Sequence, residues 1–305
     1  MFFSGDKPNS VSLPDGATGH WIGDPDAANV LVWYHGALIP FLFFFFFFKC
    51  PSNTCTLGGG FVIPASSAYF RLFRNLVKDA ERKGKSLAVF CLAYSLAPGA
   101  TYPTQLRQSV DALRFVRVGN GRRSPQNILV GGDSAGGNLL LAVLAHLAQP
   151  HPEIPPLDLG PGPDGELGGA ICLSPWVLLE SEYNEPIDSD GDLIGEGVAR
   201  VWAPAYLGGR ERDAYTDPLL TPGEWLSRFP VRNLLVLAGS HEVLYPLLRQ
   251  YGKRLQEFQP PDSKFELVVA EGECHVAPIY HCYLGEKTET VQGAKWRAWV
   301  DERIS

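Results

Sequence analysis

The chain has 305 residues, of which 45% are hydrophobic and 19% are charged, and its formal net charge is −7. These values are ordinary for a globular protein that buries either one large α/β domain or two small ones. A negative chain without a basic cluster argues against a nucleic-acid partner or an anionic membrane surface. Six cysteines in a chain of this length do not form the dense disulfide framework of a small secreted module.

The N-terminal residues lack the basic region and the long apolar region of a signal peptide. The apolar run 37–48 contains Pro40 and is shorter than the roughly 20 residues that a spanning helix needs. We therefore expect a cytoplasmic protein with free thiols and no stable membrane insertion. The oligomeric state is not readable from these features.

In chain order, short apolar runs typical of buried strands alternate with longer segments of helical periodicity. Residues 11–23 indicate two short strands around a Pro-Asp-Gly turn. Further strands are predicted at 29–36, 86–94, 168–176, 233–239 and 264–270, helices at 65–84, 102–118, 244–259 and 288–304, and a strand, tight turn and helix over 127–149.

This alternation predicts a mostly parallel sheet with helices on both faces. The Pro/Gly-rich stretch 151–169 is expected to be a surface loop rather than a boundary. We expect a single domain, 1–305, with a cap or lid insertion over 177–230, after the strand that ends near Trp176.

The stretch Gly132-Asp133-Ser134-Ala135-Gly136 has the pattern G-x-S-x-G. It follows an apolar strand and precedes a long apolar helix, which is the context of a nucleophile elbow. In that context Ser134 projects its hydroxyl above the sheet edge, and the N–H of Ala135 faces the carbonyl under attack. The alternative is a Gly/Ser-rich helix start in which Ser134 is only an N-cap.

A serine nucleophile needs a base, because its hydroxyl is a poor nucleophile at neutral pH. His275 lies after the last predicted strand, and the order serine, acid, histidine along the chain supports it as that base. A solvated loop histidine is the alternative.

Several motifs together resemble the hormone-sensitive-lipase-like branch of the α/β-hydrolase fold, and fungal esterases of that branch most closely. They are YHG…GGGF, YSLAPGATYPTQLRQSVDALRF, GGDSAGGNL, LSPW, LAGSHEVL and GECH, and they cover nearly the whole chain. The resemblance implies hydrolysis of small carboxylic esters without a metal or cofactor. It implies Ser134 as nucleophile, His275 as general base and acid, and an oxyanion hole formed by Gly36, Gly59 and Ala135.

The chain departs from this family at the acid. Where the family places an aspartate after the strand 233–239, the chain reads Ser240-His241-Glu242. The aspartate position falls on His241, so we expect the neighbouring Glu242 to orient the base. The alternative is a solvated glutamate at a helix N-terminus, where negative charge is favourable. The family also usually has a longer N-terminal region, so either the lid is reduced to the insertion or the chain is truncated.

The third departure is the interruption of His-Gly-Gly-Gly-Phe. His35-Gly36 is separated from Gly59-Gly60-Phe61 by residues 37–58, which include six consecutive phenylalanines. Adjacent exposed apolar residues violate binary patterning. Pyrimidine-rich codons can encode the run, and splice-like sequences can encode residues 52–58. We therefore interpret 37–58 as a translated intron, with a genuine hydrophobic flap as the alternative.

Two metal-site interpretations fail. Residues 188–199 suggest a calcium loop, but Leu193 and Ala199 replace the glycine and glutamate that such a loop needs. Cys50 and Cys55 lack a matching second pair of zinc ligands.

We therefore expect a serine esterase that acts through an acyl-enzyme on small or medium uncharged esters. Phe61, Trp176 and Trp202 are candidate pocket walls, although each is more often plain core. The alternatives are a catalytically impaired protein that retains only the fold, or an amidase or lactonase that uses the same residues.

Overall fold

The structure is a computed structural model that describes residues 9–36, 60–119, 123–179, 192–195, 197–260 and 262–305. The predicted insertion 37–58 lies outside these described residues. Eight strands form one sheet in the order β1-β2-β4-β3-β5-β6-β7-β8. The strands are β1 (Asn9–Ser12), β2 (Thr18–Ile22), β3 (Asn29–Tyr34), β4 (Leu87–Ala93), β5 (Ile128–Asp133), β6 (Gly169–Leu173), β7 (Asn233–Gly239) and β8 (Lys264–Ala270).

Only the first two strands break the parallel pattern. β1 pairs antiparallel with β2, and β2 pairs antiparallel with β4, whereas the pairs from β4 through β8 are all parallel. The short helix η1 (Pro14–Gly16) connects β1 and β2, as the Pro-Asp-Gly turn predicts. The mostly parallel sheet expected from the sequence is therefore confirmed.

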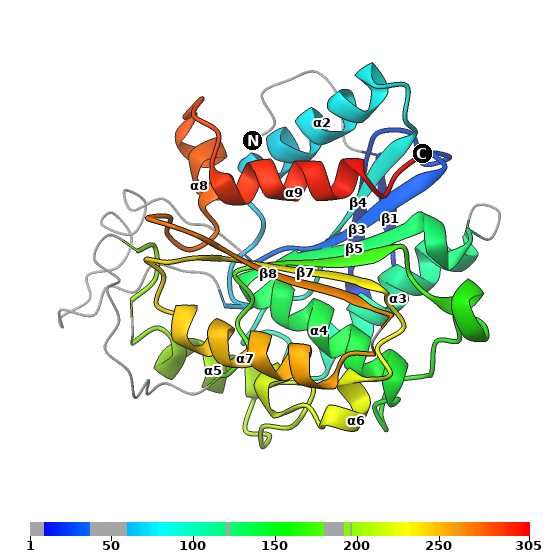
Figure 1. Ribbon diagram of the computed structural model, residues 1–305. Helices are drawn as coiled ribbons and strands as arrows, with labels where there is room; N and C mark the ends of the chain where they lie inside the picture. Colours follow the sequence, from blue (N-terminus) through cyan, green and yellow to red (C-terminus); the bar gives the residue numbers. More distant parts are fainter. Residues whose placement is uncertain (1–8, 37–59, 120–122, 180–191, 196, 261) are drawn as a thin grey trace.

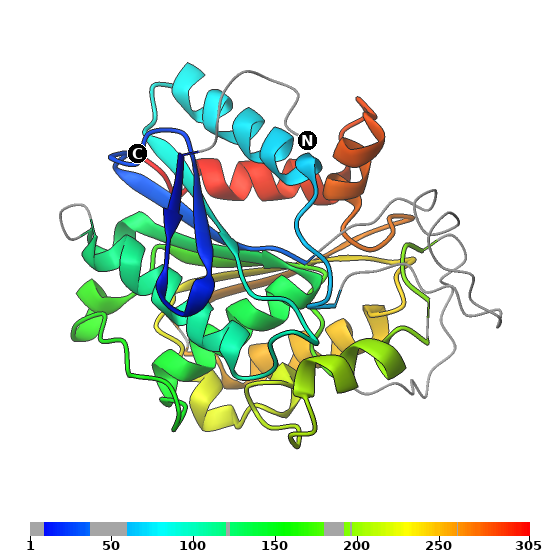
Figure 2. The same ribbon diagram turned by 180° about the vertical axis from the view of Figure 1, so that it is seen from behind.

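Helices cover both faces of the sheet (Figures 1 and 2). On one face lie α2 (Ser67–Arg82), α8 (Ala277–Leu284) and α9 (Val291–Asp301), and on the other lie α3 (Thr104–Val118), α4 (Ser134–Ala148), α7 (Tyr245–Phe258), α5 (Ala199–Leu207) and α6 (Gly223–Leu226). The remaining short helices are η2 (Pro125–Asn127), η3 (Gly162–Gly165) and η4 (Pro218–Leu220).

Each face of the sheet buries its own core, because successive strand residues point to opposite sides. In β3, Val30 and Val32 join the cluster that includes the apolar residues of α3 and α4. Leu31 and Trp33 join the cluster that includes those of α2 and α9. This double burial explains why β3 is apolar throughout rather than alternating.

Most predicted elements match within two or three residues, and β7 and β8 have the predicted bounds. The serines expected to cap the helix at 65–84 do so, since Ser66 accepts a hydrogen bond from the Ala68 N–H at 3.3 Å. The sequence did not predict α8, which follows His275 immediately, nor the helices α5 and α6 between β6 and β7.

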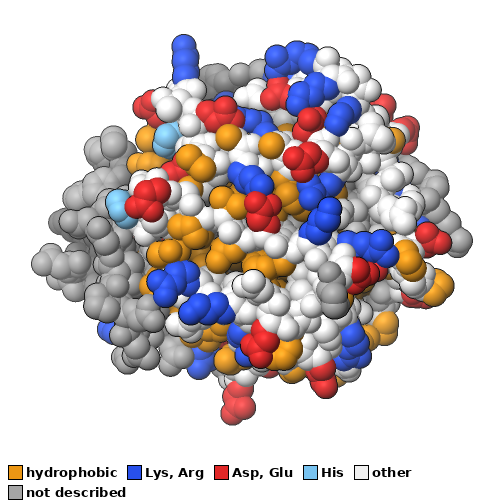
Figure 3. Space-filling model, viewed as in Figure 1, with side chains coloured by type: hydrophobic (Ala, Val, Ile, Leu, Met, Phe, Trp, Pro, Cys, Tyr) orange, Lys and Arg blue, Asp and Glu red, His pale blue; other side chains and the backbone are white. Residues whose placement is uncertain are grey.

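Acidic and basic side chains are interspersed on the face shown in Figure 3, with apolar side chains between them. Among the described residues, the helices are all too short or too polar to span a bilayer.

Candidate active site

Ser134 lies at the junction of β5 and α4, at the end of the sheet where the parallel strands terminate. Its φ is +51°, which a non-glycine residue rarely adopts, and its side chain is 6% exposed. The Ser134 carbonyl accepts a hydrogen bond from the Trp176 N–H at 2.9 Å. A strained serine between a buried strand and a helix is the geometry of a nucleophile elbow.

Two glycines let the end of β3 pack directly against this turn. A Cβ at Gly36 would lie 2.4 Å from the Asp133 Oδ2 and 2.9 Å from the Ser134 Cβ. A Cβ at Gly136 would lie 1.9 Å from the Tyr34 carbonyl oxygen. Any larger residue at either position would therefore push the strand away from the serine.

Asp133, immediately before the serine, is buried, and both of its carboxylate oxygens accept hydrogen bonds. Its carboxylate accepts hydrogen bonds from the Trp33 Nε1–H at 2.9 Å and from the Tyr69 hydroxyl at 2.6 Å. It also accepts one from the Gly36 N–H. The same N–H is the one that the resemblance implies as an oxyanion donor, and that role for Gly36 stays a prediction.

Burial raises the pKa of Asp133 to about 6, although the hydrogen bonds from Tyr69, Gly36 and Trp33 favour the ionised form. The group therefore titrates in a range where many enzymes operate. Sequence reasoning overlooked Asp133, although it is the variable residue of the G-x-S-x-G motif.

Glu242 and His275 meet in a buried hydrogen bond. The Glu242 Oε2 lies 2.8 Å from the His275 Nδ1, and the two residues are 0% and 2% exposed. The second carboxylate oxygen accepts the Gly239 N–H at 3.2 Å. Glu242 is therefore not the solvated helix-start glutamate considered as the alternative, because it is buried in the turn before α7.

The loops that carry these two residues are joined by their backbones. The His241 N–H donates to the Glu273 carbonyl at 3.1 Å, and the Ser240 N–H donates to the Ala270 carbonyl at 2.9 Å. Since β7 and β8 are neighbouring parallel strands, their carboxyl ends deliver both loops to the same edge.

The pKa shifts of the pair follow from burial and mutual charge. Burial alone would lower the pKa of His275, but the hydrogen bond and charge of Glu242, with the charges of Asp192 and Asp133, raise it above its usual value. Burial raises the pKa of Glu242, and its hydrogen bonds with His275 and Ser174 act in the opposite direction.

A short segment after β6 connects this pair to the serine. The Ser174 Oγ accepts the Val276 N–H at 3.3 Å and hydrogen-bonds to Glu242. Two residues further on, the Trp176 N–H bonds to Ser134. Because two residues span at most about 7 Å, the serine and the loop that carries His275 lie on the same side of the molecule.

Four aromatic side chains form a cluster that includes Trp176, whose backbone N–H bonds to Ser134. Phe61 stacks on Tyr206 with ring centroids 3.7 Å apart, and Trp176 lies 6.1 Å from both Phe61 and Trp202. All four side chains are buried. Trp202 and Tyr206 belong to α5, so the region between β6 and β7 contacts the segment that follows Gly60.

The structure also gives the places of the other residues named in the sequence analysis. Gly59 lies outside the described residues, whereas Ala135 is the first residue after the serine and is fully buried. The His241 backbone contacts the loop that carries His275, and His241 directly precedes the buried Glu242. Among the described residues, no three His, Cys, Asp or Glu side chains gather in a way that could hold a metal ion.

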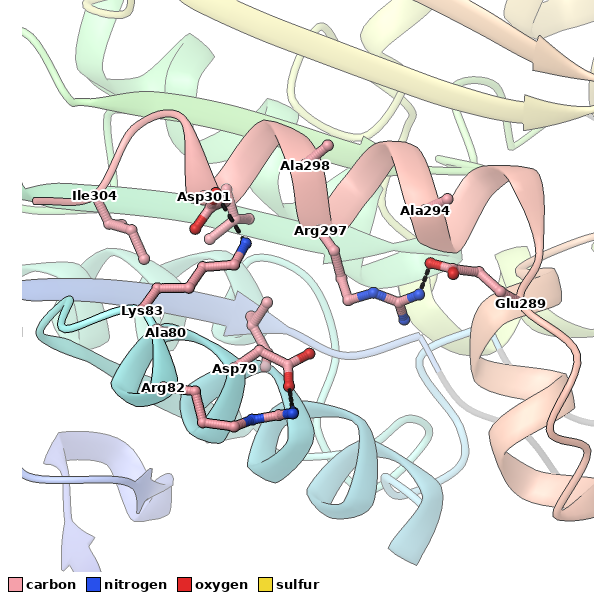
Figure 4. Close-up of a pocket in the computed structure, with 12 residues that line it drawn as sticks. Asp79, Ala80, Arg82, Lys83, Glu289, Ala294, Arg297, Ala298, Asp301 and Ile304 are labelled. Carbon is pink, nitrogen blue, oxygen red and sulfur yellow. Dashed lines mark hydrogen bonds and ion pairs between the residues drawn. The ribbon is translucent and has the colours of Figure 1, made fainter.

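A groove of about 540 Å³ lies elsewhere, between α2 and α9 (Figure 4). Lys83 pairs with Asp301 across it at 3.0 Å, and Arg297 pairs with Glu289 at its end. These cations and anions already neutralise one another, and Ser134, Glu242 and His275 do not line the groove.

Comparisons with known proteins identify the family of the chain. A family model described as alpha/beta hydrolase fold matches residues 56–279. An esterase from Gibberella moniliformis is 23% identical over 227 residues, which are 72% of this chain and 64% of that protein. An acetyl-hydrolase from Streptomyces hygroscopicus is 29% identical over 161 residues, 52% of this chain and 48% of that protein. The matched part thus spans less than two thirds of either relative.

Solved structures share the fold. Carboxyl esterase 2 from the mycorrhizal fungus Tuber melanosporum has a TM-score of 0.70 at 19% identity, covering 97% of this chain and 84% of that chain. An esterase from the bacterial hormone-sensitive lipase family has a TM-score of 0.67 at 23% identity, covering 99% and 85%. With the family model matching most of its length, the chain belongs to the alpha/beta hydrolase fold family.

Proposed function

We propose that the protein is a serine carboxylic-ester hydrolase in which Ser134 is the nucleophile, His275 the general base and acid, and Glu242 the acid that orients the base. The observation that carries this proposal is the buried 2.8 Å contact between Glu242 and the His275 Nδ1, on the same sheet edge as the strained Ser134. A carboxylate there holds the proton on Nδ1, and Nε2 is left free to accept one.

The reaction proceeds in two halves. The Ser134 oxygen attacks the ester carbonyl while the His275 Nε2 takes its proton, and the resulting imidazolium is stabilised by Glu242. The proton is then given to the departing alcohol, which leaves an acyl group on Ser134. Water, deprotonated by the same histidine, attacks the acyl group, and its proton returns to Ser134 as the acid is released.

The tetrahedral intermediate in each half carries a negative oxygen that needs hydrogen-bond donors. We assign one donor to the Ala135 N–H at the start of α4. We assign the others to the N–H groups of Gly36 and Gly59, of which Gly59 lies outside the described residues. Gly36 contributes by packing against Ser134 and Asp133.

The substrate is a small, uncharged ester. The aromatic cluster of Phe61, Trp176, Trp202 and Tyr206 beside the serine favours apolar acyl or alcohol groups. Relatives named acetyl-hydrolases make short acyl groups the first to test. We assign residues 177–230, which supply Trp202 and Tyr206, as the cap over the serine within a single domain.

Hydrolysis of p-nitrophenyl acetate and butyrate by the full chain tests the proposal, with Ser134→Ala as the matched control. We expect turnover by the wild type and a loss of turnover in the variant. Turnover that survives in Ser134→Ala would contradict the assignment, and so would a folded wild type without turnover toward either ester. The latter result would favour the catalytically impaired alternative suggested by residues 37–58.

A further inference from the structure

Asp192 joins the two loops that carry the proposed acid and base. Its Oδ1 accepts the His275 N–H at 2.8 Å, and its Oδ2 accepts the Val243 N–H at 2.8 Å. Val243 directly follows Glu242. A single carboxylate therefore binds the backbone of the base and the backbone next to the acid.

This carboxylate comes from a third part of the chain. Asp192 belongs to the residues between β6 and β7, whereas His275 follows β8 and Val243 follows β7. Its Oδ1 also accepts the N–H of Leu193, which ties the carboxylate to its own backbone. The hydrogen bonds of this one carboxylate thus join the cap region to both loops.

We propose that Asp192 is a positioning residue that fixes the Glu242–His275 pair by holding both loop backbones, and that it couples docking of the cap region to assembly of the site. The proposal rests on the proposed function of the pair. The stretch 188–199, rejected above as a calcium loop, contains this residue, so one of its acidic groups has a role other than metal binding.

The chemistry requires a carboxylate rather than an amide. Both oxygens of Asp192 accept backbone N–H groups, and an asparagine can place a carbonyl oxygen at only one of those positions. Its NH₂ group would then face a backbone donor. One loop would be released, and a misplacement of about 1 Å costs about 10²-fold in rate.

The negative charge of Asp192 also raises the pKa of His275. His275 is faced by Glu242 from the turn before α7, by Asp192 from the cap region and by Asp133 from the end of β5. Glu273 on its own loop directs its carboxylate to the Val291 and Gln292 N–H groups at the start of α9. Removing the Asp192 charge therefore lowers the pKa of His275.

The test compares Asp192→Asn and Asp192→Glu with Glu211→Gln, which removes an exposed carboxylate from the same insertion. We expect Asp192→Asn to lower kcat for p-nitrophenyl acetate by about 10- to 100-fold with little change in KM, because the carboxylate contacts backbone and not substrate. Asp192→Glu keeps the charge but extends the side chain, so it should lower kcat while leaving the pKa of His275 near the wild-type value. Glu211→Gln should match the wild type.

A second readout does not depend on turnover. The titration of His275, followed by NMR of histidine-labelled protein without substrate, should shift to lower pH in Asp192→Asn only. A wild-type His275 titration in that variant would overturn the proposal, even if kcat fell, because the fall would then reflect a general loss of structure. If the titration shifts while the wild type hydrolyses no ester, the proposed function fails, and the contact between the Asp192 carboxylate and His275 stands.

Discussion

Replacing Glu242 by glutamine tests how the site controls its histidine. The substitution preserves the size of the side chain but removes its charge. Because the carboxylate accepts hydrogen bonds from both the His275 Nδ1–H and the Gly239 N–H, the amide NH₂ must oppose one of these donors. If it faces His275, the ring proton moves to Nε2, and the histidine can no longer accept the serine proton.

The expected loss is large because the pair is buried. Wrong-tautomer substitutions at such an acid cost about 10⁴-fold in kcat, equivalent to about 5.4 kcal/mol of transition-state stabilisation. The pKa of His275 should also fall, since Glu242 is the main group that raises it. Residual activity should therefore persist to lower pH than wild-type activity does.

Measurement of kcat and KM for p-nitrophenyl acetate across pH 5 to 9 checks both expectations, with urea unfolding to verify the fold. Glu257→Gln, an exposed glutamate on α7, is the matched control and should behave as the wild type. A Glu242→Gln enzyme within a few-fold of wild-type kcat would refute the assignment of the acid.

Three further predictions concern Tyr69, His275 and residues 37–58. Tyr69→Phe should cost about 1.5–3 kcal/mol of unfolding free energy at pH 8, where Asp133 is ionised, and less at pH 5, below its pKa of about 6. Tyr251→Phe is its control, because the Tyr251 hydroxyl has no hydrogen-bond partner among the described residues; urea titration at both pH values should show little change. The raised pKa of His275 places the acidic limb of kcat/KM above pH 6.5, so activity should be lost as pH falls through that limb. Deleting residues 37–58, which joins Gly36 to Gly59, should raise kcat by about 10²–10³-fold in the same ester assay if an oxyanion donor is restored.

Each of these has a contrary outcome. An equal loss of unfolding free energy at pH 5 and pH 8 in Tyr69→Phe would show that the strength of the hydrogen bond from the Tyr69 hydroxyl does not depend on the charge of Asp133. An acidic limb below pH 6.5 would contradict the electrostatic role of Glu242. A deletion variant no more active than the intact chain, together with a transcript that retains the codons for 37–58, would favour a genuine flap over a translated intron.

The strands β3 to β7 were predictable because they are buried on both faces. Runs such as 233–239 are continuously apolar, and they end where the buried strands end. The helix α8 was not predicted because it is only eight residues long and has no polar cap. Its N-cap is Val276, which follows His275 and has a φ of +46°. Its position depends on packing against α2 and α9 rather than on local pattern.

The candidate serine, histidine and glutamate were easier to predict than the residues that contact them. Ser134 and His275 follow strand ends, where the fold converges, and Glu242 is the carboxylate beside the substituted position. Asp133 and Asp192 depend on partners about 60 to 100 residues away in the chain, such as Tyr69, Trp33 and His275. No local spacing encodes such contacts. The contact between the Gly36 N–H and the side chain of Asp133 was not predicted for the same reason.

The most direct test of the central claim is labelling of the native chain with a fluorophosphonate, followed by peptide mapping. The account predicts one phosphonylated residue, Ser134, with labelling lost in Ser134→Ala and strongly slowed in His275→Ala. Labelling at another residue, or the absence of labelling in a folded wild-type chain, would contradict it.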